Sequence, residues 1–277
     1  FFIFLLYFTA PALAVLAKYE VFNVLVGTPF TELPAWIQSW TRVDPALLSV
    51  ADINKDGIFQ LGEMRIGGDI IVLATPEIAG LPYVVSGMVA AGGLAAALST
   101  ADGLLLTIAN ALSHDLYYKM IDPNAPTARR VMISKVLLLV VALAAASVAA
   151  QKPADILFLV SAAFSFAAAA FFPALTLGIF WKRANKWGAS LGMIAGLGTT
   201  FYYMATTQPW LRGMFGVTSP IADNIWWGIQ PISAGLFGVP LGFAVIIVVS
   251  LLTPAPGKAT QELVEHVRYP DLRLGKA

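Results

Sequence analysis

Two adjacent hydroxyl side chains lie in the middle of a long apolar run of this chain. Ser99 and Thr100 follow a stretch rich in alanine and glycine, and Asp102 comes shortly after them. Charged groups at membrane depth are costly and by default mark a path for ions or protons. In a helix the Ala96 carbonyl lies about one turn before both hydroxyls, so these oxygen atoms can face one sodium ion. The remaining ligands must then come from another helix.

Both features also have a plainer interpretation. Serine and threonine in membrane helices often donate back to a carbonyl of their own helix. Asp102 can form a second cation or proton site, or it can form a structural hydrogen bond to a neighbouring helix. The adjacent hydroxyls, the helix of small residues and the nearby acid favour an ion site. His114, near the end of the same run, fits an interfacial position better than a proton relay.

A second pattern with chemical meaning is the polar segment 52–63, DINKDGIFQLGE. Its spacing is that of an EF-hand calcium loop, with oxygen ligands at alternate positions, a glycine for the turn and a glutamate at the end. The alternative is a calcium-free polar turn, because Gly67 and Gly68 allow only a short exit helix. The predicted calcium ligands are Asp52, Asn54, Asp56, the Ile58 carbonyl, Gln60 through a water, and Glu63.

The composition places the chain in a membrane. Of its 277 residues, 58% are hydrophobic and only 12% are charged, whereas soluble domains carry about 25% charged residues. The net charge of +1 gives no indication of nucleic-acid binding, and the absence of cysteine excludes disulfides and thiolate chemistry. No catalytic triad, metal-ligand cluster or phosphate-binding glycine loop is apparent, so we do not expect an enzyme.

Several stretches are apolar and long enough to cross a bilayer, which takes about 20 helical residues. Backbone groups in lipid must bond within their own segment, so these spans are predicted to be helices. The sequence therefore predicts an all-α integral membrane protein. Its six predicted spans are 1–22, 82–113, 131–151, 155–181, 187–207 and 231–253.

Lysine and arginine side chains set the predicted orientation. They gather after the second, fourth and sixth spans, and few lie on the other side. We therefore expect 1–22 to be a transmembrane helix, 23–80 an external loop, 82–253 a five-helix transmembrane region and 254–277 a cytoplasmic tail. Phe1 lies directly in an apolar run without a basic n-region. We interpret the chain as a piece of a longer membrane protein rather than as the start of a secreted one.

The run AALSTADGLLLTIANALSHDLYYK resembles the sodium-binding helix of the sodium:solute symporter family. The family's pattern there is a Ser-Thr or Ser-Ser pair followed, at the cytoplasmic end, by D-[LI]-Y. Ser99-Thr100 and Asp115-Leu116-Tyr117 match it. The later run GIFWKRANKWGASLGMIAG and the last span extend the resemblance over most of the chain. Within the family, the chain looks most similar to the cation/acetate symporter-like branch.

This resemblance implies the LeuT-type inverted-repeat transporter fold, of which the chain would form the C-terminal half with about six transmembrane helices. It implies that Ser99, Thr100 and the Ala96 carbonyl bind sodium as the coupling ion. The implied activity is sodium-coupled symport of a small organic solute, acetate or another small carboxylate, by alternating access in the inner (plasma) membrane. Asp102 departs from the family's pattern. The family's first core helix is absent, so we do not expect transport without the N-terminal half.

Two further functional classes stay open at this point. Some regulatory proteins attach a kinase to a symporter-like membrane region, although the short tail of this chain counts against such a sensor. A passive channel is the third interpretation. In each case an external calcium ion in the loop 52–63 would be structural, because extracellular sites of about millimolar affinity stay filled.

Overall fold

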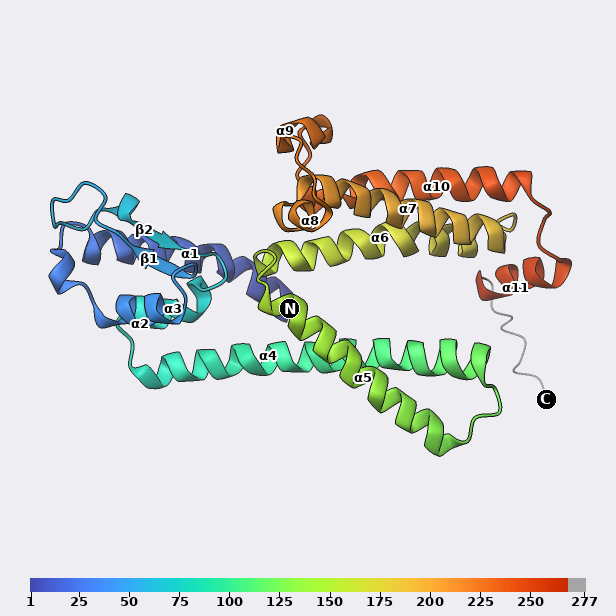
Figure 1. Ribbon diagram of the computed structural model, residues 1–277, viewed down its shortest axis with the longest axis horizontal. Coiled ribbons are helices and arrows are strands. Elements are labelled where there is room, and N and C mark those ends of the chain that lie inside the picture. The colour runs from blue at the N-terminus through green and yellow to red at the C-terminus, as the bar shows by residue number, and fades with distance from the viewer. Residues whose placement is uncertain (269–277) are drawn as a thin grey trace. The chain divides into compact units, whose positions relative to one another are not determined.

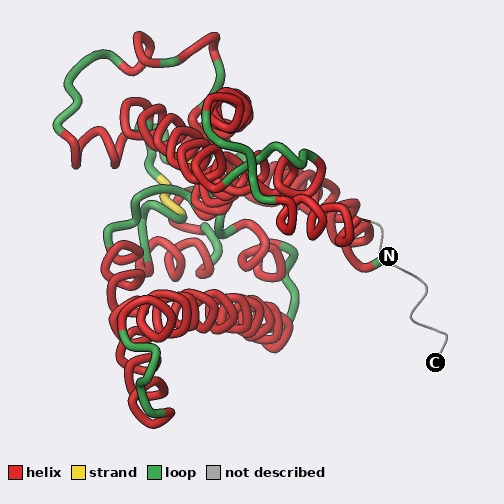
Figure 2. Tube along the Cα trace, turned by 90° about the vertical axis from the view of Figure 1, so that its right-hand side faces the viewer, coloured by secondary structure: helices red, strands yellow, loops and turns green. Residues whose placement is uncertain are grey.

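The computed structural model describes residues 1–268 and divides into two compact units, Phe1–Lys152 and the part from Pro153 onward (Figure 1). Helices dominate both units. The strands of the described chain are two short ones in the first unit (Figure 2).

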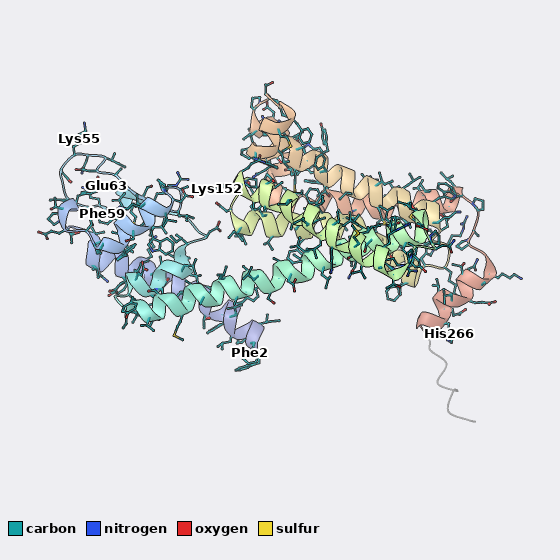
Figure 3. The ribbon with its side chains drawn as sticks, turned by 60° about the horizontal axis from the view of Figure 1, so that its bottom comes forward. Phe2, Lys55, Phe59, Glu63, Lys152 and His266 are labelled. Carbon is teal, nitrogen blue, oxygen red and sulfur yellow. The ribbon has the colours of Figure 1, made fainter. Side chains whose placement is uncertain are left out.

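The first unit begins with a long apolar helix, α1 (Phe2–Leu25), whose Phe2 side chain is exposed (Figure 3). A group of short elements over residues 26–80, called the cap below, follows it. The short antiparallel sheet in the cap, with Ser49 opposite Arg65, departs from the all-α prediction. The elements of the cap are η1 (Phe30–Glu32), α2 (Ala35–Val43), β1 (Leu48–Val50), η2 (Leu61–Glu63), β2 (Met64–Ile66) and α3 (Ile71–Ile78).

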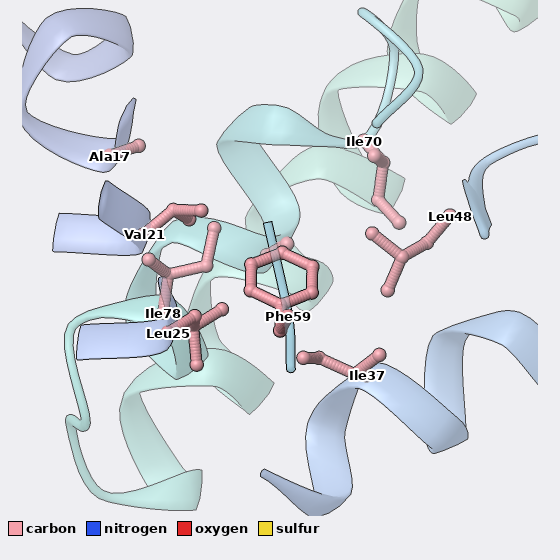
Figure 4. Close-up of a cluster of buried hydrophobic side chains, with 9 residues drawn as sticks. Ala17, Val21, Leu25, Ile37, Leu48, Phe59, Ile70 and Ile78 are labelled. Carbon is pink, nitrogen blue, oxygen red and sulfur yellow. The ribbon is translucent and has the colours of Figure 1, made fainter. Parts of the chain in front are cut away.

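A buried apolar cluster joins the cap to α1 (Figure 4). Phe59 is completely buried at its centre, and its ring contacts that of Phe30 edge-on at 6.0 Å between centroids. Burying one large apolar side chain stabilises a fold by about 1.5–3 kcal/mol, so this cluster fixes the cap on the C-terminal half of α1. Its members are Ala17, Val21, Leu25, Ile37, Leu48, Phe59, Ile70, Ala74 and Ile78.

A helical hairpin completes the first unit. Helix α4 (Tyr83–Asn110) continues into a π-helical stretch, η3 (Ala111–Ile121), and α5 (Thr127–Ala150) packs against both (Figure 1). The continuous helix Tyr83–Ile121 has 39 residues, well beyond the ~20 that a bilayer requires. π-Helical stretches are rare and frequently accompany functional sites.

The second unit is a bundle in which three long helices, α6, α7 and α10, run side by side (Figure 1). Its short elements connect or extend these helices. The elements are α6 (Ile156–Phe180), α7 (Lys186–Thr207), α8 (Pro209–Phe215), α9 (Ile221–Asn224), η4 (Trp226–Gly228), η5 (Pro231–Ser233), α10 (Gly235–Leu252) and α11 (Lys258–Arg268).

Glycines bring the backbones of α7 and its neighbours into contact. Gly192 and Gly196 lie one turn apart on the buried face of α7. A Cβ atom at Gly192 would overlap the Ile246 side chain, and one at Gly196 would overlap the Ala169 carbonyl. Small residues allow this close approach between membrane helices. On the exposed side of α7, nothing lies within 4 Å of a Cβ atom placed at Gly198.

Five described helices are long and apolar enough to cross a membrane, which makes this a multi-pass membrane protein. They are Phe2–Leu25, Tyr83–Ile121, Thr127–Ala150, Ile156–Phe180 and Pro231–Leu252. The predicted span 187–207 forms helix α7, but α7 is not among the five. Several of its glycine, threonine and tyrosine residues, such as Gly196, Thr200 and Tyr203, are buried against neighbouring elements, so it needs no apolar surface all round. The predicted count of six is therefore not confirmed.

An ion pair connects the end of α5 to the cap. Lys152 Nζ contacts the Asp44 carboxylate, which also accepts a hydrogen bond from the Ala46 N–H at 2.9 Å. Lys152 has φ +47°, a left-handed conformation that is costly for a residue with a side chain. The Lys152 ammonium and, to a smaller extent, the Ala46 N–H hold the pKa of Asp44 below its ordinary value of 3.8.

This pair predicts a stability that depends on pH. A carboxyl whose pKa is lowered on folding adds stability above its unfolded-state pKa, and that stability is lost as the pH falls through the folded-state pKa. Asp44→Asn should therefore lower the Tm at about pH 7 and lower it by less at about pH 2. Thermal unfolding in detergent measures both values. Glu32→Gln, an exposed acid of the same cap, is the control, and an equal loss at both pH values would contradict the ion pair.

Candidate functional site

The predicted sodium ligands lie on one face of α4, near the middle of Tyr83–Ile121. Ala96 lies about one turn before Ser99 and Thr100, so the three residues are neighbours on the helix surface. The Thr100 hydroxyl donates to the Ala96 carbonyl at 3.1 Å. All three residues are exposed. Two of the predicted ligand oxygens are thus hydrogen-bonded to each other.

This bond leaves the oxygen atoms usable as ligands. A hydroxyl has one proton to donate and two lone pairs, so the Thr100 oxygen still presents lone pairs outward. The Ser99 hydroxyl makes no hydrogen bond with the residues that the structure describes. The face therefore offers several oxygen atoms within one turn, and a second helix would have to complete a sodium shell.

Asp102 lies one turn after Ser99 on the same helix. Its side chain is exposed, and it has neither a hydrogen bond nor an ion pair within the described part of the chain. A second ion or proton site and a contact to another helix therefore both stay predictions for this carboxylate.

A network of ionisable side chains lies at the far end of this helix, in η3. The Asp115 carboxylate contacts His114 Nδ1 at 3.0 Å and Lys119 Nζ at 3.2 Å. Tyr117 donates to Asp122 at 3.3 Å. His114 and Asp115 are both exposed, and the interfacial position of His114 stays a prediction. Sequence reasoning missed the Asp115–Lys119 ion pair, although a spacing of four residues on a helix indicates one. It also missed the π-helical geometry, for which the residue types give no such signal.

The loop 52–63 has the turn that its pattern predicts. Gly57 has φ +74°, which glycine adopts without steric cost, and its N–H donates to Asp52 at 3.0 Å. The other Asp52 oxygen is buried without a partner. The Ile58 N–H donates to Asp56 at 2.8 Å and is the largest cause that holds the pKa of Asp56 below 3.8. Lys55 projects outward from the loop (Figure 3).

Several of the predicted calcium ligands are engaged by hydrogen bonds within the loop. Glu63, the expected bidentate ligand, accepts the N–H groups of Ile53 and Gln60, each at 2.9 Å. The side-chain amides of Asn54 and Gln60 donate to Asp56 at 2.7 and 3.0 Å. Within residues 1–268, no group of three or more His, Cys, Asp or Glu side chains is placed to hold a metal ion.

The calcium prediction is therefore not supported. The hydrogen bonds within the loop satisfy most of these side chains without a metal ion. Among the described residues, support is lacking for the predicted set as a whole, Asp52, Asn54, Asp56, the Ile58 carbonyl, Gln60 and Glu63.

Glu63 instead closes the loop with its own carboxylate. Glu63→Gln replaces one acceptor oxygen by a donor that faces a backbone N–H, so we expect a loss of about 1–3 kcal/mol in the free energy of unfolding. The loss should be the same with excess calcium and with a chelator, as measured by thermal unfolding in detergent. Glu32→Gln again serves as the control. A loss seen only in calcium would show that Glu63 acts as a metal ligand.

Several known proteins are similar to this chain. An uncharacterized symporter of Cupriavidus necator is 56% identical over 268 residues, 97% of this chain and 39% of the relative. The high-affinity proline transporter PutP of Bacillus subtilis is 31% identical over 179 residues, 65% of this chain and 34% of the relative. The sodium/proline symporter of Escherichia coli is 32% identical over 219 residues, 79% of this chain and 36% of the relative. No solved structure matches the chain.

The chain spans 34–39% of the length of these relatives. A family profile matches the central part, residues 69–196, which contains both Ser99-Thr100 and Asp115-Leu116-Tyr117. The profile and the named relatives describe transporters rather than enzymes. Because of this matched segment and these relatives, we conclude that the chain belongs to the sodium:solute symporter family.

Proposed function

We propose that this chain is part of a sodium-coupled symporter that carries a small carboxylate-bearing solute across the membrane. The observation that carries the proposal is the oxygen-rich turn of α4. Ser99, Thr100 and the Ala96 carbonyl share one exposed face at the middle of a membrane-length helix. The same residues lie in the segment that matches the family profile.

Sodium would bind to this turn together with ligands from a second helix of the full-length protein. At a membrane potential of about −100 mV, each entering sodium ion contributes roughly 2.3 kcal/mol to solute uptake. Bound sodium would favour the outward-facing arrangement, and its release inside would free the solute. The proposal includes an inverted-repeat fold that works by alternating access. It also places the C-terminus in the cytoplasm, on the basis of the positions of lysine and arginine.

Proline is the first solute to test. Two of the relatives described above carry proline in their names, as a proline transporter and as a sodium/proline symporter. Acetate, which the sequence led us to expect, has no support from those names and serves as the comparison solute. Proline and acetate share a carboxylate, so competition between them reports on recognition of that group.

The sodium site predicts a specific defect in uptake. Ser99→Ala and Thr100→Ala in the full-length protein each remove one oxygen ligand, and bonds to a charged group contribute about 1.5–3 kcal/mol. The sodium concentration for half-maximal uptake should therefore rise about tenfold or more for each change. Uptake of labelled proline into proteoliposomes at varied sodium concentration measures it.

The matched control is Thr107→Ala. Thr107 lies on the same helix and donates to the Gly103 carbonyl at 2.8 Å, so it loses the same kind of hydrogen bond as Thr100. Its sodium dependence should stay as in the unchanged protein. If uptake does not depend on sodium, and Ser99→Ala and Thr100→Ala leave it unchanged, the assignment of these residues to a sodium site is refuted.

Asp102 predicts a change in coupling. If its carboxylate binds a second cation or a proton, Asp102→Asn should lower the number of cations moved per solute or remove a pH dependence of uptake. Asp102→Glu keeps the charge and should restore both. Stoichiometry follows from the solute gradient that a known sodium gradient and voltage sustain. Unchanged stoichiometry and pH profile in Asp102→Asn would leave Asp102 with a structural role.

A further inference from the structure

A cavity of about 520 Å³ lies at one end of the α6, α7 and α10 bundle in the second unit. Helices α6 and α10 are both long and apolar enough to cross a membrane, and both end beside this cavity, at Phe180 and Leu252. Its volume lies in the range typical of small-molecule sites. Most of its wall is apolar, including Ala174, Gly178, Ile246, Pro254, Pro256 and Val264.

Helix α11 forms one side of the cavity through Thr260 and Val264, which lie one turn apart. An ion pair of 2.9 Å between Lys182 and Glu265 holds α11 to the segment that follows α6. The Lys182 ammonium and the Glu265 carboxylate thus neutralise each other. Across the cavity, no atom lies within 4 Å of a Cβ atom placed at Gly178, so the space there is open.

Two other cations of the same region have no acidic partner among the described residues. Lys186 lines the cavity, with its Nζ 5.5 Å from the centroid of the Trp187 ring, which also lines it. Arg183 donates to the Thr253 carbonyl at 2.7 Å, while its Nη1 atom is buried without a partner. Asn185, another lining residue, donates to the Thr253 hydroxyl at 2.7 Å, so Arg183 lies next to the cavity wall.

We propose that this cavity binds an anionic phospholipid, with part of an acyl chain against the apolar wall and the phosphate near Lys186 and Arg183. An apolar wall bordered by unpaired cations, at the ends of two membrane-length helices, matches a molecule with a hydrocarbon chain and a negative headgroup. Tryptophan and lysine are typical of the membrane interface where such headgroups lie. The phospholipid site does not depend on the transported solute or on sodium.

Native mass spectrometry of the full-length protein in detergent tests the proposal. The probes are dioleoyl phosphatidylglycerol and dioleoyl phosphatidylcholine, which share their chains and differ in net charge. We expect one phosphatidylglycerol to bind about fivefold more tightly or better, since one cation near a lipid surface contributes ~1 kcal/mol. Lys186→Gln should remove most of this preference. Gly178→Leu should weaken binding of both lipids because its side chain fills the cavity.

The controls change the same residue types elsewhere in the second unit. Lys258→Gln removes a cation of α11 that does not line the cavity, and Gly198→Leu enlarges a glycine that is equally open. Both should bind phosphatidylglycerol like the unchanged protein. Equal binding of the two lipids, or unchanged binding in Lys186→Gln, would overturn the proposal. If Gly178→Leu lowers the Tm strongly, Lys186→Gln alone decides the outcome.

Discussion

In hydrocarbon, every backbone N–H and C=O must find its partner within its own helix, and the hydroxyl side chains of this chain follow the same constraint. On the membrane-length helices and α7, most threonine side chains donate to a carbonyl one turn earlier. The Thr100 bond to Ala96 is therefore ordinary for such a side chain and does not by itself mark a site. The residues of these helices with this bond are Thr9, Thr100, Thr107, Ser147, Thr199, Thr200, Thr206 and Thr207.

Within the turn of α4 that contains Ala96, Ser99 and Thr100, the Ser99 side chain differs from that of Thr100. Its hydroxyl makes no such bond within the described residues, so its proton can turn away and both lone pairs can face a cation. A helix that already satisfies its backbone needs nothing more for stability at this position. The exposed hydroxyl oxygens of Ser99 and Thr100 therefore have lone pairs available for a ligand outside their own helix. In the proposed function that ligand is a sodium ion.

Hydropathy predicts the long helices well because a helix that faces lipid must be apolar on most sides. The same reasoning fails for α7, whose neighbours cover its polar residues. Tyr203, for example, is completely buried and donates to the Ile229 carbonyl. The strands β1 and β2 have three residues each, too few to show a periodicity of two. The calcium prediction lacks support for another reason, since a pattern of residue types does not show which donors the Glu63 carboxylate meets.

The glycine contacts of α7 also limit how this sequence can vary over evolutionary time. At Gly192 and Gly196, even one methyl group overlaps a neighbouring helix, so those positions can change only if the facing residue changes too. Gly198, two residues after Gly196, has open space around it, so other residue types can replace it without a steric clash. Tolerance to substitution along α7 should therefore rise and fall with the helical period, and Gly192 and Ile246 should covary as a pair.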